Sequence, residues 1–182
     1  MYTGSLVRLR ALEEADLNDL WRHLNDMDTM RLVTDAPVLP ATAADAEKIL
    51  LDQTSHSTGV YQFAVEDLED GRFLGRCGFT SLDRKNRHGE IAIHLGEKRG
   101  RGRGADAVRL LCRFGFTELG LHRITARTFD FNLACARCLE KCGFEQEGFL
   151  RDELYRDGAW HGVRIYGLIA PAEGGTRETK GV

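Results

Sequence analysis

The chain has 182 residues, which is long enough for one domain and marginal for two. Its 28 acidic and 25 basic side chains leave a net charge of −3, which argues against a dedicated polyanion-binding protein but permits a local basic patch. No apolar run reaches the roughly 18 residues of a membrane span, and charges follow the N-terminus too closely for a secretory signal. We therefore expect a cytoplasmic protein whose five cysteines are reduced thiols.

The first half of the chain predicts a strand, two helices and then a meander of three strands. Alternation predicts a strand over Ser5–Arg10, and apolar residues at intervals of three and four predict a helix over Glu13–Asn25. Thr42 is expected to cap a second helix that runs to about Thr54. From Val60 the period changes to two. The expected strands are Tyr61–Leu68, Arg72–Leu82 and Gly89–Gly96.

The second half alternates between helix and strand. The expected elements are a helix over Ala105–Leu119, a strand over Leu121–Phe129, a helix over Asn132–Cys142, and strands over Phe144–Leu150 and His161–Ile169. The tail from Pro171 is expected to be disordered. The order β-α-α-β-β-β-α-β-α-β-β, without repeat or linker, predicts one α/β (α+β) domain over residues 1–170.

The joint between strand 89–96 and the next helix is rich in glycine and arginine. Gly100, Gly102 and Gly104 let the backbone approach a ligand closely, with amides directed into one concavity. The N-terminus of the helix that begins there adds unpaired N–H groups and the positive end of its dipole, which suit a phosphate. Four cations surround the same place: Lys98, Arg99, Arg101 and Arg103.

This joint matches neither the Walker pattern GxxxxGK[ST] nor the dinucleotide fingerprint GxGxxG. Taken alone, it supports a phosphate cradle and a flexible basic turn about equally. An RNA contact through alternating arginine and glycine is weaker, because such segments are usually longer.

Two motifs together resemble the GNAT family of N-acetyltransferases. Arg99-x-x-Gly102-x-Gly104 is similar to the R/Q-x-x-G-x-G/A loop that binds coenzyme A in that family. Farther along, the segment from Asn132 to Gly148 resembles the second family signature, N-x-x-[SA]-x-x-x-[YL]-x-K-x-G-F-x-x-x-G. The stretch from Phe149 to Gly158 is similar to the RimJ/RimL branch, whose best-known members acetylate protein N-termini.

The resemblance implies a single GNAT-like domain with a mixed, mostly antiparallel sheet flanked by helices. It implies direct transfer of an acetyl group from acetyl-CoA to a primary amine, without a metal. The first expectation for the acceptor is the N-terminal α-amine of a protein, of the ribosomal-protein type. The alternative is a small amine such as a polyamine, amino sugar or antibiotic. No membrane or direct nucleic-acid contact is expected, and a homodimer is compatible with the resemblance.

The resemblance also assigns cofactor-binding positions. The pantetheine arm of acetyl-CoA is expected along the edge of the strand before the glycine loop, and the phosphates at the loop itself. A backbone N–H near Ile93 or His94 would polarise the thioester carbonyl. The residues expected to bind acetyl-CoA are Ile91, Ala92, Ile93, His94, Leu95, Arg99, Gly100, Arg101, Gly102, Arg103, Gly104, Ala105, Asn132 and Lys141.

Two residues are candidates for moving protons. Glu90 occupies a position where the family often has a water-linked acid, and a solvated or salt-bridged strand residue is an equally weighted interpretation. His94 shares its strand face and is a rival base, although a structural imidazole is favoured. Many relatives have a tyrosine as general acid where this chain has Leu139. The thiol of Cys135 is the candidate acid instead, with a small buried helix residue or a water-mediated transfer as alternatives.

Three cysteines, Cys135, Cys138 and Cys142, recur on the helix that Asn132 opens. No partner set of Cys or His at zinc spacing accompanies them, so packing of a helix is favoured over a metal site.

The family binds its acceptor between the two N-terminal helices and the loop joining them, here Asp28–Pro40, and at the turn before the final strand. Asp26, Asp28 and Asp35 would attract a cationic acceptor, although solvent-facing acids are the favoured interpretation. A non-catalytic acyl-CoA sensor and an RNA-binding module remain alternative functions.

Overall fold

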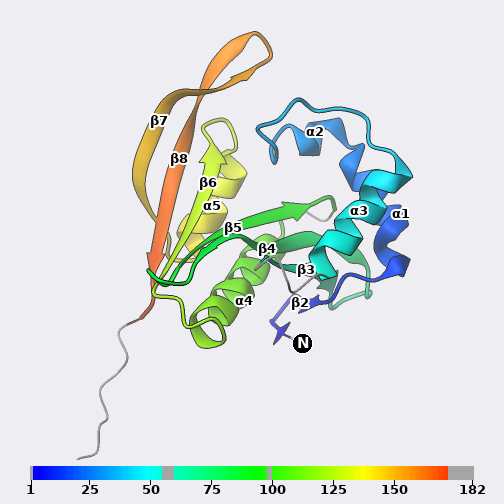
Figure 1. Cartoon of the computed structure of the whole chain (residues 1–182), viewed down its shortest axis with the longest axis horizontal. Coiled ribbons are helices and arrows are strands. Elements are labelled where there is room, and N and C mark those ends of the chain that lie inside the picture. Colours follow the sequence, from blue (N-terminus) through cyan, green and yellow to red (C-terminus); the bar gives the residue numbers. More distant parts are fainter. Residues whose placement is uncertain (1, 55–59, 98–99, 172–182) are drawn as a thin grey trace, which may run out of the picture.

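An eight-stranded mixed sheet organises the computed structural model, which describes residues 2–54, 60–97 and 100–171 (Figure 1). The strand order is β1-β2-β3-β4-β5-β6-β8-β7, and every neighbouring pair is antiparallel except β5 with β6. The strands are β1 (Tyr2–Thr3), β2 (Val7–Arg10), β3 (Tyr61–Asp67), β4 (Phe73–Asp83), β5 (His88–Leu95), β6 (Arg123–Phe129), β7 (Glu145–Arg156) and β8 (Ala159–Ile169).

Helices cover both faces of this sheet. On one face α4 (Arg103–Thr117) and α5 (Leu133–Lys141) bury a large apolar core against the strands, including Val108, Leu111 and Ile124. On the other face α1 (Leu17–Leu24), which follows a 3-10 turn, and α3 (Ala43–Thr54) enclose a smaller core with β3 and β4. The short helix α2 (Met27–Met30) follows α1. None of the helices in the described ranges is long and apolar enough to cross a membrane.

The architecture confirms the α/β domain and the mixed, mostly antiparallel sheet. The structure adds β1 and α2, which contain two and four residues and are too short to show a period in the sequence. Thr42 caps α3 as expected: its hydroxyl accepts from the Asp45 N–H at 3.3 Å, and the Asp45 carboxylate accepts from the Thr42 N–H at 2.7 Å. Most of the expected tail, residues 172–182, lies outside the described residues.

Strand β7 is longer than the sequence predicted. It continues past Leu150 to Arg156, and its register against β8 shifts between Leu150 and Leu154. This irregularity interrupts the alternation of apolar and polar residues from which the strand was predicted. The predicted strand therefore ended at Leu150, before the observed one. The extra residues make β7 and β8 a long hairpin that projects beside the rest of the sheet (Figure 1).

The parallel pair of strands is short and opens at one end. β5 pairs with β6 only from His88 to Ile91, opposite Arg123 to Ala126, whereas β4 follows β5 as far as Leu95. Residues 92–95 therefore have a strand on one edge only within the described part of the chain. Beyond Ile91 the two halves of the sheet diverge, and α4 begins shortly after the free end of β5.

Two charged side chains fix the start of α4: Asp106 contacts the N-terminal segment, and Arg103 contacts the end of β3 and the turn after it. The buried carboxylate of Asp106 accepts from the backbone N–H of Leu6 at 2.7 Å and of Val7 at 3.1 Å. The buried guanidinium of Arg103 donates to Asp67 at 3.1 Å and to Glu69 at 2.7 Å. These contacts hold the helix N-terminus beside the end of β5.

Replacing the Asp106 carboxylate should destabilise the fold. Asp106→Ala leaves the N–H groups of Leu6 and Val7 without their acceptor, and we expect a loss of about 1–3 kcal/mol in the free energy of unfolding. Urea unfolding followed by circular dichroism measures it. The exposed Asp52 provides the control, since Asp52→Ala removes the same charge. Equal midpoints for the two variants would contradict the anchoring role of Asp106.

Candidate active site

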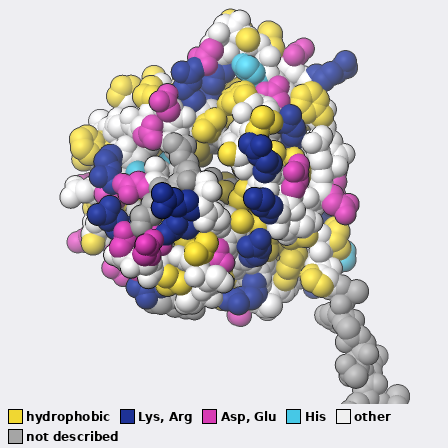
Figure 2. Space-filling model, turned by 180° about the vertical axis from the view of Figure 1, so that it is seen from behind, with side chains coloured by type: hydrophobic (Ala, Val, Ile, Leu, Met, Phe, Trp, Pro, Cys, Tyr) yellow, Lys and Arg dark blue, Asp and Glu magenta, His cyan; other side chains and the backbone are white. Residues whose placement is uncertain are grey.

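The divergence of β5 and β6 creates a cleft with a volume of about 840 Å³. It is lined by β5, the first turn of α4, the inner face of α5, the ends of β6 and β7, and the segment that follows α2. Seen from behind, the molecule is hollowed near its middle, and Lys and Arg side chains gather beside the hollow (Figure 2).

Most of the residues expected to bind a cofactor meet in this cleft. The expected residues that line it are Ile91, Ala92, Ile93, His94, Leu95, Gly100, Gly102, Gly104, Ala105, Asn132 and Lys141, together with the catalytic candidates Glu90 and Cys135. Arg101 is exposed and does not line it. Arg99, with its neighbour Lys98, lies outside the described residues.

At one end of the cleft lie the three glycines that the sequence singled out, Gly100, Gly102 and Gly104. Gly102 is the N-cap of α4 with a φ of 84°, a conformation that favours glycine, and no side chain caps the helix. The N-terminus of a helix of this length is a favourable place for an anion. Lys141 of α5 also lines this end.

The side chain of Arg103 is directed elsewhere. Its guanidinium forms ion pairs with Asp67 and Glu69, and it does not line the cleft. The sequence analysis included Arg103 among the cations around the loop. A pattern of charges in a sequence does not show which charged side chains form ion pairs. At this end of the cleft, the backbone of Arg103 forms part of the first turn of α4, and its side chain holds that helix in position.

The free edge of β5 forms one wall. Alternation places Glu90, Ala92 and His94 on the face of the sheet toward α1, while Ile91 packs into the core on the α4 side. The half-buried Glu90 lies where β5 still pairs with β6, opposite Thr125. Its side chain therefore faces the cleft near the point at which the strands separate.

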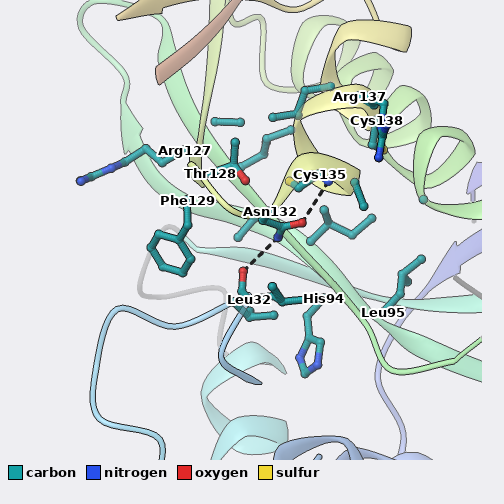
Figure 3. Close-up of a pocket in the computed structure, with 18 of the residues that line it drawn as sticks. Leu32, His94, Leu95, Arg127, Thr128, Phe129, Asn132, Cys135, Arg137 and Cys138 are labelled. Carbon is teal, nitrogen blue, oxygen red and sulfur yellow. Dashed lines mark hydrogen bonds between the residues drawn. The ribbon is translucent and has the colours of Figure 1, made fainter. Parts of the chain in front are cut away.

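His94 lies farther along β5 and packs against a second histidine. Its buried ring points away from Asn132 and Cys135 in Figure 3, and its centroid is 6.2 Å from that of His23 on α1. Burial lowers the pKa of His23, which favours a neutral imidazole in the core. This packing agrees with the structural interpretation of His94.

Asn132 connects the two sides of the cleft. Its side-chain oxygen accepts from the Cys135 N–H at 3.1 Å and caps α5, while its amide nitrogen donates to the Leu32 carbonyl at 3.2 Å (Figure 3). Asparagine is a favoured residue at the start of a helix, which is where the sequence places Asn132. The contact with Leu32 could not be expected from the sequence, because Leu32 is a hundred residues away in the chain.

Cys135 faces the cleft from the first turn of α5, beside Thr128 of β6 (Figure 3). Burial raises the pKa of its thiol, although the neighbouring Thr128 hydroxyl opposes the shift. A raised pKa keeps the thiol protonated at neutral pH, and it also makes the thiol a weaker proton donor than an unshifted one. Leu139, at the position of the family's usual tyrosine, is buried in the core.

The other two cysteines, Cys138 of α5 and Cys142 at its C-cap, interact with each other as free thiols. A hydrogen bond from Cys138 lowers the pKa of Cys142, and burial and that same bond raise the pKa of Cys138. Among the described residues, no cluster of His, Cys, Asp or Glu has the geometry to hold a metal ion.

The opposite end of the cleft is formed by the segment after α2 and by the β7–β8 hairpin. Thr29, Leu32, Val33 and Asp35 line it from the first side, and Glu153 and Leu154 from the second. Asp26, one of the three acids that the sequence singled out, is the N-cap of α2 and accepts from the Thr29 N–H at 3.2 Å. Asp28 is exposed and does not line the cleft, so Asp35 is the acid of the three that does.

Several lining residues were missed by the sequence analysis: Thr128, Arg137, Glu153 and Leu154. They occupy ordinary strand and helix positions, and no motif marks them. Their place in the site comes from the spatial convergence of α5, β6 and β7.

Comparisons with known proteins give the fold and the cleft a context. A family model described as an acetyltransferase (GNAT) domain matches residues 7–145. The chain is 28% identical over 170 residues to the uncharacterized N-acetyltransferase p20 of Bacillus licheniformis, covering 93% of this chain and 95% of that protein. It is 27% identical over 119 residues to the [ribosomal protein uS5]-alanine N-acetyltransferase of Escherichia coli, covering 64% and 61%.

A solved structure agrees with the fold over nearly the whole length. The spermidine N-acetyltransferase of Vibrio cholerae, crystallised in complex with CoA and spermine, superposes with a TM-score of 0.79 at 24% identity. The match covers 90% of this chain and 95% of that one. With the family model spanning most of the domain, the chain belongs to the GNAT family of acetyltransferases and is an N-acetyltransferase.

Proposed function

We propose that the cleft binds acetyl-CoA and transfers its acetyl group directly to a primary amine, with the N-terminal α-amine of a protein as the acceptor. The observation that carries this proposal is the separation of β5 from β6 after Ile91, next to an uncapped helix N-terminus. The separation offers a backbone edge to an extended amide-bearing arm, and the helix offers N–H groups to phosphates.

The phosphates of acetyl-CoA would lie at the start of α4. Gly102, Gly104 and Ala105 line that end of the cleft, and the chain there presents main-chain groups with little side-chain bulk. A Cβ on Gly104 would lie 3.6 Å from Cys138 Sγ and from Leu95, which is an ordinary contact distance. Arg137 and Lys141 add positive charge from α5.

The pantetheine arm would lie along the free edge of β5, with the thioester near the point where β5 and β6 part. A backbone N–H of Ile93 or His94 is then in place to polarise the thioester carbonyl. Holding the amine against the thioester reduces the barrier by up to about 7–11 kcal/mol. Positioning by the cleft walls is therefore the main catalytic contribution.

Glu90 is the proposed base. It faces the cleft from β5, near the proposed place of the thioester, and a carboxylate can take the amine's proton directly or through one water. An α-amine has a pKa of about 7.7–8.0 and a lysine amine one of about 10.4, so an α-amine makes the smaller demand on a carboxylate base. This difference supports the N-terminal α-amine as acceptor.

Cys135 is the proposed acid for the departing thiolate of coenzyme A. Its half-buried thiol lines the cleft from the first turn of α5 and carries a proton at neutral pH. Donation of the proton to the leaving sulfur would leave a cysteine thiolate, which the amine's released proton neutralises after the reaction. The hydroxyl of Thr128, beside Cys135, would stabilise that thiolate through a hydrogen bond.

A polyamine is the second candidate acceptor. The acceptor end of the cleft is lined by Asp35 and Glu153, and Glu90 lies where β5 and β6 part. These three carboxylates suit an acceptor with more than one positive charge. The spermidine N(1)-acetyltransferase of Vibrio cholerae is 26% identical over 162 residues, covering 88% of this chain and 91% of that enzyme. Glu153 is also paired with Arg127 at 3.0 Å, which reduces the negative charge there.

Thermal unfolding with acetyl-CoA tests the donor. At about 100 times the dissociation constant, the ligand adds about 2.7 kcal/mol, which raises the melting temperature by roughly 5–10 °C. Turnover is then measured by thiol release with an alanine-initiated peptide, its N-terminally blocked form and spermidine. Activity on the free peptide alone supports the first acceptor, and activity on spermidine alone supports the second. A folded protein without a thermal shift would overturn the assignment of the cleft to acetyl-CoA.

Substitutions in the cleft test the proton transfers. Glu90→Gln should lower kcat by about 10²–10⁴ with an unchanged KM for acetyl-CoA, and raising the pH should restore part of the rate because more of the amine is then unprotonated. Cys135→Ala should lower kcat, and Cys135→Ser, which keeps a donor, should lower it less. Glu118→Gln, at an exposed position just after α4, is the control. A Glu90→Gln enzyme with the pH profile of the control would contradict the role of Glu90.

A further inference from the structure

One arginine joins the two sides of the acceptor end of the cleft. Arg156, the last residue of β7, donates from Nη1 to the carbonyl of Arg31 and from Nη2 to the carbonyls of Thr34 at 2.8 Å and Ala36 at 3.2 Å. Its guanidinium also lies over the ring of Phe129, 5.7 Å from the centroid. A single side chain of the hairpin thus holds three main-chain groups of the segment 31–36.

Two further contacts close the same gap. Arg31 forms an ion pair with Asp157, which follows Arg156 at the hairpin turn. The carbonyl of Leu32 accepts from the amide of Asn132 at 3.2 Å. The segment 31–36 is therefore held at its start by α5 and along its length by the hairpin, although both partners are about a hundred residues or more away in the chain.

The segment has little internal structure that would keep it in place. Its backbone N–H groups bond back to α2 as far as Thr34, and the Ala36 N–H donates to the Thr34 hydroxyl at 3.1 Å. Within the described part of the chain, no backbone–backbone hydrogen bond involves residues 35–41. Asn25 and Trp21 then fix Ala41 from α1. Between these two fixed points, Arg156 holds the carbonyls of Thr34 and Ala36.

The held segment and the hairpin also form the walls of the acceptor end. Leu32, Val33 and Asp35 come from the segment, and Leu154 lies two residues before Arg156 on β7. Phe129, which Arg156 covers, lines the cleft as well. Together with the Arg31–Asp157 ion pair, the guanidinium therefore joins two walls that are far apart in the sequence.

We propose that Arg156 is a specificity-determining residue: by holding residues 31–36 against the β7–β8 hairpin, it makes the acceptor entrance a narrow passage. Such a passage admits an extended chain that ends in a primary amine, such as a peptide N-terminus or a polyamine, and rejects amines carried on a ring, such as amino sugars. This inference rests on the proposed acetyl transfer in the cleft, and it acts through position, since Arg156 itself does not line the cavity.

Arginine suits this role because its planar fork directs several N–H groups to separate carbonyls. Lysine retains the charge but presents a compact ammonium on a flexible stem, so it cannot reproduce the same set of contacts. Arg156→Lys and Arg156→Ala therefore form a graded pair. Arg113, which is exposed on α4 and does not line the cleft, provides the control Arg113→Ala.

The first measurement is steady-state kinetics with an alanine-initiated peptide, spermidine, glucosamine and kanamycin. For Arg156→Ala, we expect the KM of the preferred extended amine to rise about tenfold or more while the KM for acetyl-CoA stays within twofold. The ratio of kcat/KM for ring amines to that for extended amines should rise, with Arg156→Lys between wild type and Arg156→Ala. An unchanged ratio, or an equal rise in both KM values, would overturn the proposal.

Two measurements need no acceptor. Amide hydrogen exchange at residues 31–36 should accelerate in Arg156→Ala but not in Arg113→Ala, because the segment loses its support. Hydrolysis of acetyl-CoA to acetate and free coenzyme A should rise several-fold, since a wider passage admits water to the thioester. If wild type acetylates none of the test amines, the proposed acceptors fail, and these two rates judge the role of Arg156. Unchanged exchange and hydrolysis would refute it.

Discussion

The site depends on one constraint, the early end of the pairing between β5 and β6. The two strands share only the register from His88–Arg123 to Ile91–Ala126, after which β5 stays with β4 and β6 stays with β8. A fully paired sheet would use the main-chain groups of residues 92–95 for its own hydrogen bonds. Because they are left at a free edge, the same backbone that builds the fold is available to an extended ligand.

The N-terminus of α4 lies beside this free edge and gives one end of the cleft a preference for anions. The helix begins a few residues after β5, and Asp106 and Arg103 hold its first turn against the N-terminal strands. Both contacts use charged groups to fix a helix end whose own N–H groups no side chain caps. A chain with a net negative charge can thus present a locally favourable place for phosphates, since the acids near α4 are bound to Arg103 or to backbone N–H groups.

Much of the fold and of one end of the cleft could be predicted from the sequence. Periodicity located the longer elements, and the glycines and Asn132 marked where backbone and caps would face a ligand. The pairing of Arg103 with Asp67 could not be predicted, because the two belong to different elements and charge patterns carry no partner information. The role of Arg156 was equally hidden, since β7 runs past a register shift before reaching it.

The two ends of the cleft are held in place by different kinds of interaction. At the α4 end, the geometry comes from a helix, a strand edge and a buried core, so it forms with the domain itself. At the other end, residues 31–36 are placed by backbone hydrogen bonds to α2, by the Arg31–Asp157 ion pair and by a few hydrogen bonds from Asn132 and Arg156. Asn132 links residues 31–36 to α5, because the same side chain caps the helix that carries Cys135 and holds Leu32. A shift of residues 31–36 would therefore displace the start of α5, whereas the α4 end of the cleft would keep its shape.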